Sequence, residues 1–131
     1  MTVASNIILP KIILTRICAD GTAIPKGTLM KLSGTNIAIA GVGSGEAFGG
    51  ITVEEKVASD GMVTVGCAMD GVWDIVNSSA ATDASGSIVC MSGANMFRKC
   101  VAGDLLTGAE MGKLEALGVA SSATRVRLIG V

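Results

Sequence analysis

The stretch Gly45–Val76, GEAFGGITVEEKVASDGMVTVGCAMDGVWDIV, contains two turn signals and the single tryptophan of the chain. Val63 and Val65 alternate with smaller or more polar residues, which is the period-2 pattern of a strand. The dipeptides Asp60-Gly61 and Asp70-Gly71 flank this strand, and Asp-Gly suits the positive φ angles of tight hairpin turns. The stretch therefore predicts up to three consecutive antiparallel strands.

The surroundings of Trp73 follow from the second turn signal. A two-residue turn at Asp70-Gly71 would pair Ala68 with Trp73 and place Gly66 diagonally beneath the indole. These small residues would leave room for the ring. A ligand-stacking tryptophan usually has aromatic neighbours, and aromatic residues make up only 2% of this chain. We therefore predict that Trp73 is an anchor of the core or of a subunit interface.

Turn signals recur through the remaining sequence, which favours a mostly β fold. Further strands are predicted in Asn6–Ile17, Thr28–Leu32, Asn36–Ala40, Ser87–Met91, Asn95–Val101 and Thr124–Val131. Two hairpins are predicted among them, one over Ser33-Gly34 and one over Ser92-Gly93. Only Ala109–Leu117 has a helical pattern, and Gly112 weakens it. We predict a compact β-sandwich or barrel-like domain with at most one or two short helices and an extended N-terminal arm. The arm or edge strand would cover residues 1–20 and a single β domain residues 21–131.

The composition predicts a subunit that is covered by other chains. Half of the 131 residues are apolar and 16% are charged. An isolated domain of this kind would expose apolar patches larger than the few hundred Å² that monomers tolerate. The net charge is −1 and the basic residues are scattered, which argues against nucleic-acid binding. Arg125 and Arg127 alternate with apolar residues, so they are expected on the outward face of a last strand.

The N-terminal sequence argues against membrane insertion and export. Its apolar run is broken by Pro10, Lys11 and Arg16, and no run approaches the ~20 residues that span a bilayer. It also lacks the pattern of a signal peptide. We expect a chain made in a cytoplasm with no membrane partner.

Residues for catalysis are scarce. The chain has no histidine and no tyrosine, so only cysteine, lysine and carboxylates remain as acid or base candidates. Glu54 and Glu55 are adjacent and would face opposite ways on a strand. The glycine-rich segment Gly41–Gly45 lacks both the lysine ending and the following helix of a nucleotide loop. We therefore predict neither an enzyme nor a cofactor site.

The four cysteines do not have the spacing of metal ligands. They are Cys18, Cys67, Cys90 and Cys100. Buried free thiols are the default expectation, and a disulfide pair is the alternative. No metal site is predicted.

The segment around Pro10 is the candidate for contact with another protein or with a neighbouring subunit. Proline in a strand marks an edge or a bulge, and a bare aliphatic edge invites aggregation. Two alternatives are open: the segment folds onto its own sheet, or it docks on a neighbour as an added strand. The candidate contact residues are Ile7, Ile8, Leu9, Ile12, Ile13 and Leu14. Because the hairpins lie downstream, the chain from Gly21 onward is expected to fold without this arm.

The order of these features resembles a family of small phage capsid cement proteins and is similar to the head-decoration protein of lambda-type phages. The resemblance is carried by Ile24–Leu29 (IPKGTL), Phe48–Ile51 (FGGI), Gly61–Val65 followed by Gly71-Val72, and Arg125–Leu128 (RVRL). Together these motifs span about residues 22 to 131. The N-terminal segment differs from the family pattern because it is more apolar and is broken by proline.

The resemblance implies a β-tulip-like domain that forms a homotrimer on the outer surface of an icosahedral phage head. The implied partners are the major capsid protein, which the arm Met1–Ile17 would contact, and other copies of the chain. The implied role is to stabilise the shell as a virion protein. Two alternatives are a tail or baseplate β-module and a small glycan-binding β domain. The low aromatic content counts against the glycan binder.

Overall fold

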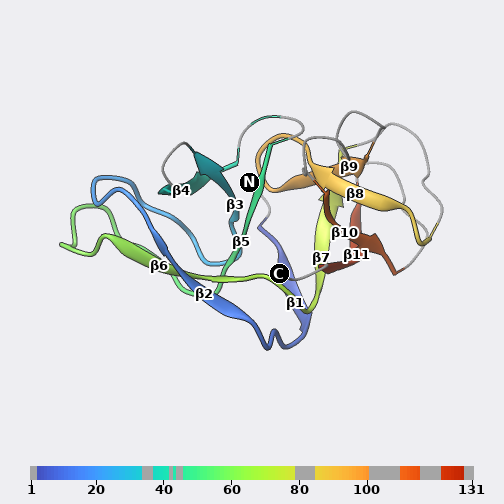
Figure 1. The fold of residues 1–131 in the computed structure, drawn as a ribbon, viewed down its shortest axis with the longest axis horizontal. Coiled ribbons are helices and arrows are strands. Elements are labelled where there is room, and N and C mark those ends of the chain that lie inside the picture. The colour runs from blue at the N-terminus through green and yellow to red at the C-terminus, as the bar shows by residue number, and fades with distance from the viewer. Residues whose placement is uncertain are drawn as a thin grey trace.

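In the computed structural model the chain consists of strands and turns, and the described residues contain no helix. The structure describes residues 3–33, 37–41, 43, 46–78, 85–100, 110–115 and 122–128. The expectation of a mostly β, barrel-like fold is confirmed. Two groups of strands lie side by side along the long axis of the molecule (Figure 1).

The first group closes into a small barrel in the order β2-β4-β3-β5-β6. Its strands are β2 (Ile13–Ile17), β3 (Leu29–Ser33), β4 (Ile37–Ala40), β5 (Phe48–Thr52) and β6 (Thr64–Ala68). Strand β2 pairs with β6 along its whole length, from Ile13 opposite Ala68 to Ile17 opposite Thr64. A buried cluster around Met30 and Val65 packs within this group. The predicted pairing of the strands on either side of Ser33 is confirmed.

The second group is a six-stranded sheet in the order β1-β7-β11-β10-β8-β9. Its strands are β1 (Ser5–Ile8), β7 (Val72–Asn77), β8 (Ile88–Met91), β9 (Met96–Lys99), β10 (Glu110–Leu114) and β11 (Ala123–Leu128). Strand β9 returns to pair with β7, so all of these strands except β1 form a ring. The predicted β8–β9 hairpin is confirmed. Arg125 and Arg127 are exposed on β11 as expected.

One hydrophobic core joins the two groups. Leu29 and Ile51 of the barrel pack in the same buried cluster as Trp73 and Phe97 of the sheet. A polar contact crosses the same boundary, since the backbone N–H of Leu29 donates to Oδ1 of the buried Asn95 at 3.0 Å. Barrel and sheet therefore share a continuous interior.

The predicted hairpin between β6 and β7 is wrong. Gly71 has the expected positive φ of 94°, but the chain here passes from the barrel to the sheet. Strand β6 pairs with β2 and β5, whereas Trp73 on β7 lies opposite Asn6 and Val126 rather than Ala68. Long ladders with distant strands outweigh the single local ladder that the turn signal suggested. The Asp60-Gly61 signal lies in the connection from β5 to β6, which is longer than a tight hairpin.

The predicted helix around Ala109–Leu117 is also wrong, because Glu110–Leu114 forms β10. This strand pairs with β8 on one side and with β11 on the other. Gly112 permits the pairing, since a Cβ at this position would overlap the carbonyl oxygen of Arg127. Hydrogen bonding on both edges of the strand overrides a weak local helical preference.

Candidate docking surface

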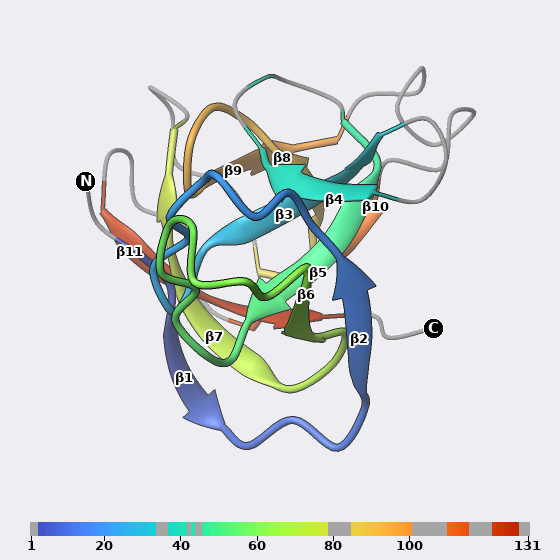
Figure 2. The same cartoon turned by 90° about the vertical axis from the view of Figure 1, so that its left-hand side faces the viewer.

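The N-terminal segment forms two strands, β1 and β2, on either side of Pro10. Figure 2 shows them on opposite sides of the view, joined by a loop formed by residues 9–12. Strand β1 pairs with β7, and β2 pairs with β6 and β4 inside the barrel. The segment thus folds onto its own chain, which is the first of the two alternatives. Because β2 closes the barrel, the expectation that residues from Gly21 onward fold independently loses its basis.

Asp70 holds the loop between these two strands. The backbone N–H groups of Lys11 and Ile12 donate to Asp70 Oδ1 at 2.9 and 2.8 Å. The N–H of Met69 donates to the carbonyl oxygen of Ile12 at 2.9 Å, and Trp73 Nε1 donates to the Asp70 carbonyl at 3.0 Å. This role of Asp70 was not predicted from the sequence, because Asp70-Gly71 was interpreted as a turn that joins two paired strands.

Most of the candidate contact residues are exposed. Ile7, Ile8, Leu9 and Ile13 are exposed, while Ile12 and Leu14 are half-buried. The exposed fraction reaches 80% at Leu9 and 52% at Ile13. Ile13 is more exposed than Leu14 because successive side chains of a strand point to opposite faces. Trp73 is only 3% exposed and belongs to the core.

A second group of exposed aliphatic side chains lies at the other end of β2. It consists of Ile17, Val57, Met62 and Val63. Ile17 and Val63 are close because the N–H of Cys18 donates to the Val63 carbonyl at 2.8 Å. Val57 and Met62 were not predicted as surface contacts from the sequence, although the apolar pair Met62-Val63 directly after Gly61 was a visible signal for Met62. Among the residues whose exposure the structure describes, which leaves out residues 37–39 of β4, every large exposed hydrophobic side chain lies between residues 7 and 17 or between 57 and 63.

A cleft of about 660 Å³ opens between β1 and β2. Its lining is mostly apolar and includes Asn6, Leu9, Ile13, Lys26, Val53 and Trp73. Two exposed residues of the candidate set, Leu9 and Ile13, thus line one concave surface together with Trp73. This arrangement can bind an apolar or extended partner.

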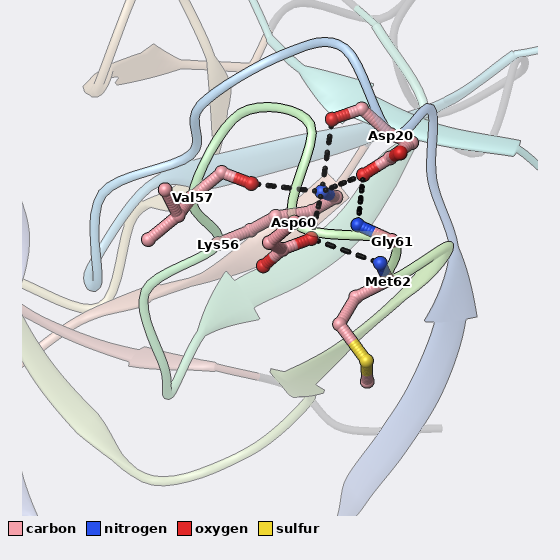
Figure 3. Close-up of polar contacts among 6 residues, drawn as sticks. All are labelled: Asp20, Lys56, Val57, Asp60, Gly61 and Met62. Atoms are coloured by element: carbon pink, nitrogen blue, oxygen red, sulfur yellow. Dashed lines mark hydrogen bonds and ion pairs between the residues drawn. The ribbon is translucent and has the colours of Figure 1, made fainter.

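The connection from β5 to β6 is held by a buried lysine (Figure 3). Lys56 is 2% exposed, and its Nζ lies 2.9 Å from Asp60 Oδ1 and 3.1 Å from Asp20 Oδ1. It also donates to the carbonyl oxygens of Asp20 and Val57 at 3.0 and 3.1 Å. Burial disfavours the ammonium, but the hydrogen bonds to Asp60 and Asp20 outweigh it and raise the pKa of Lys56.

The two carboxylates also fix the backbone of this connection. Asp20 Oδ1 accepts the Gly61 N–H at 3.0 Å, and Asp60 Oδ1 accepts the Met62 N–H at 2.9 Å (Figure 3). The hydrogen bonds from Lys56 and Met62 lower the pKa of Asp60. The network therefore positions the exposed Met62 and the neighbouring Val63.

The described residues hold no group of three potential metal-binding side chains. Cys18 and Cys67 are buried free thiols, as expected, while Cys90 is buried and Cys100 is half-buried. Burial raises the pKa of Cys67 to about 11, although the charge of Arg16 acts in the opposite direction. Such a thiol is a poor nucleophile at neutral pH.

Three further sequence interpretations concern the surface. Glu54 and Glu55 are both exposed, and Glu54 Oε1 accepts the Gly66 N–H at 2.9 Å. Much of the glycine segment Gly41–Gly45 lies outside the described residues. In the described part of the chain, no helix is long and apolar enough to cross a membrane.

Comparisons of the chain with models of known protein families and with curated proteins found no match.

Proposed function

We propose that this chain is a structural virion protein that binds the outer surface of an icosahedral phage head as an oligomeric cement subunit. Its partners in this proposal are the major capsid protein and other copies of itself, with a homotrimer as the expected assembly. The role is to stabilise the shell by contacts alone, so neither catalysis nor a cofactor takes part.

The observation that carries the proposal is the clustering of exposed aliphatic side chains in two neighbouring stretches of the chain. In the described residues they gather on β1, the loop 9–12, β2 and residues 57–63. The outward side chains of β11 are instead charged: Arg125 pairs with Asp74 at 3.4 Å, and Arg127 pairs with Glu115. A subunit with an apolar surface beside β2 and ion pairs on β11 suits a molecule that lies on a surface and faces water elsewhere.

Many subunits that each bind weakly can together stabilise a shell. A specific interface generally needs about 1,000 Å² or more, and repeated contacts around a closed shell add by multivalency. Each subunit therefore needs only modest affinity. A rigid β framework that presents a contact surface fits this requirement.

The proposal is tested by mixing the purified chain with bare heads of the encoding virus. Electron microscopy should show added density on the outer surface, and a heat challenge should show that decorated heads rupture at a higher temperature. A variant with aspartate at both Leu9 and Ile13 should bind fewer copies, because it places charges on the apolar side. The matched control carries Lys99→Asp and Lys113→Asp, two exposed positions on the sheet.

Density located only at the tail or baseplate would contradict the proposal. So would unchanged binding by the Leu9 and Ile13 variant, since the apolar side would then not be the contact surface.

A further inference from the structure

The exposed side chains of Ile17, Val57, Met62 and Val63 form a group that we term the tip patch. Each of them is 55% to 57% exposed. They lie where β2 ends and β6 begins, at the end of the barrel farthest from the sheet (Figure 1). Single exposed apolar residues are common on protein surfaces, whereas a contiguous group marks a site of interaction. The tip patch is therefore a candidate contact surface.

A small acidic cleft lies directly beside the tip patch. Its volume is about 80 Å³, and Met62 of the tip patch is part of its lining. Thr64, which also lines it, lies opposite Ile17 on the neighbouring strand. The lining contains three carboxylates, those of Glu54, Glu55 and Asp60. Tip patch and acidic cleft thus form one surface with an apolar part and a negatively charged part.

The negative charge of the acidic cleft is not balanced by an exposed cation among its described lining residues. Lys56 is the one basic residue in this lining, and it is 2% exposed. Its ammonium is already held by Asp20 and Asp60. The exposed side chain of Glu55 makes no recorded contact within the described part of the chain. A basic side chain from a partner would complement this cleft.

The tip patch keeps its position without a partner. The carboxylates of Asp20 and Asp60 accept the N–H groups of Gly61 and Met62 at 3.0 and 2.9 Å. The carbonyl oxygen of Val63 accepts a hydrogen bond from the end of β2 at 2.8 Å. A contact surface that is already ordered loses less conformational entropy when it binds. The surface is therefore preorganised for docking.

We propose that the tip patch docks on a basic surface of the shell protein, where aliphatic side chains cover the patch and a lysine or arginine side chain enters the acidic cleft. This inference rests on the proposed function and adds to it the chemistry of the partner surface. Burial of the patch supplies affinity, and the opposite charges speed association and select the partner. The contact is made by side chains at the far end of the barrel and does not involve β1.

Oxidation of Met62 measures whether the tip patch is covered. Hydrogen peroxide transfers one oxygen atom to a methionine thioether and leaves water, and the rate follows the exposure of the sulfur. Peptide mass spectrometry of the full chain, free and bound to bare heads, gives this rate for each methionine. We expect the rate at Met62 to fall at least about fivefold on heads. The buried methionines Met30, Met91 and Met111 should react slowly in both samples, which shows that the chain stays folded.

Matched charge variants test the acidic cleft. Glu55→Lys should weaken attachment to heads at least about fivefold at about 0.1 M sodium chloride and less at about 1 M, where salt screens the charges. Glu115→Lys makes the same change in net charge at an exposed position directly after β10, and it should leave attachment unchanged. Its ion pair with Arg127 is exposed, so its loss costs little stability. Circular dichroism and denaturant melts of each variant show that it is folded.

The outcomes separate this inference from the proposed function. If the chain decorates heads but Met62 stays reactive, the tip patch is not the docking surface and the decoration role stands. If the chain binds no heads at any salt concentration, the proposed function fails and this inference fails with it. Equal loss of attachment in Glu55→Lys and Glu115→Lys would show that net charge acts rather than the acidic cleft, and would overturn the proposal. Protection of Met62 in the free chain as its concentration rises would assign the tip patch to a second copy and also overturn it.

Discussion

Trp73 connects the core, the loop 9–12 and the cleft through a single side chain. Its ring packs in the shared core, and its Nε1 donates to the Asp70 carbonyl, whose side chain holds the loop. Packing of the ring and the position of the loop are therefore linked. The sequence indicated that Trp73 would be a packing anchor, but it did not indicate which residues Trp73 contacts.

We expect Trp73→Ala to lower the free energy of unfolding by about 3 to 5 kcal/mol, the range for emptying a large buried aromatic site. Denaturant melts followed by circular dichroism measure the loss. Ile17→Ala is the control, since it truncates an exposed side chain of β2. A loss below about 1 kcal/mol would show that the ring contributes little to the core of the isolated chain.

Lys56 is expected to stabilise the chain over a defined range of pH. The raised pKa of Lys56 means that its contribution is complete below the ordinary value of 10.5 and is lost as the pH rises through the raised value. The lowered pKa of Asp60 means that its contribution is complete above the ordinary value of 3.8 and is lost as the pH falls through the lowered value. Lys56→Met should therefore lower the melting temperature most between these limits.

The comparison is made by thermal melts of both proteins across this pH range. Lys113→Met is the control because Lys113 is exposed on β10. A difference between wild type and Lys56→Met that stays constant down to strongly acidic pH would show that the ion pairs do not stabilise the fold.

At the scale of elements, β2 determines whether the barrel closes. It pairs with β6 over five residues and with β4 at Ile17. Its outward residues Ile13 and Ile17 are exposed, so its stabilising contribution comes from main-chain pairing and from its inward face.

Deleting residues 2–14 should abolish cooperative unfolding, because it removes β1 and the first two residues of β2. A shorter deletion, residues 2–8, removes β1 but leaves β2 intact. We expect this shorter form to melt at a lower temperature with a single sharp transition. A cooperative transition in the longer deletion would restore the view that the downstream strands fold alone.

At the scale of the whole molecule, barrel and sheet share one interior. Leu29 and Ile51 pack with Trp73 and Phe97, and the Asn95 side chain crosses the same boundary. Two groups of strands that bury each other's surfaces are expected to unfold together.

Calorimetry should therefore show one transition whose calorimetric and van't Hoff enthalpies agree. A fragment that ends at Asp70 should fail to fold, because it exposes the apolar side of the barrel that the sheet covers. Two separate transitions, or a folded fragment, would show instead that barrel and sheet are independent units.

Local sequence patterns by themselves determined the fold class and many of the strands. Alternation placed Arg125 and Arg127 outward on β11, and Ser92-Gly93 marked the β8–β9 hairpin, because residues close in sequence supply the whole signal. The apolar run around Pro10 also marked the segment that carries most of the exposed aliphatic side chains.

Only the tertiary structure decided which strands pair and where the cleft lies. Asp70-Gly71 has the chemistry of a hairpin turn, yet β6 and β7 separate because each finds longer ladders with distant strands. Gly112 similarly permits a strand where the local pattern suggested a helix, since its missing side chain lets β11 approach. Lys26, Val53 and Trp73 meet at one surface only after the barrel has closed against the sheet. Pairings of this kind depend on residues far apart in the sequence, and no local pattern encodes them.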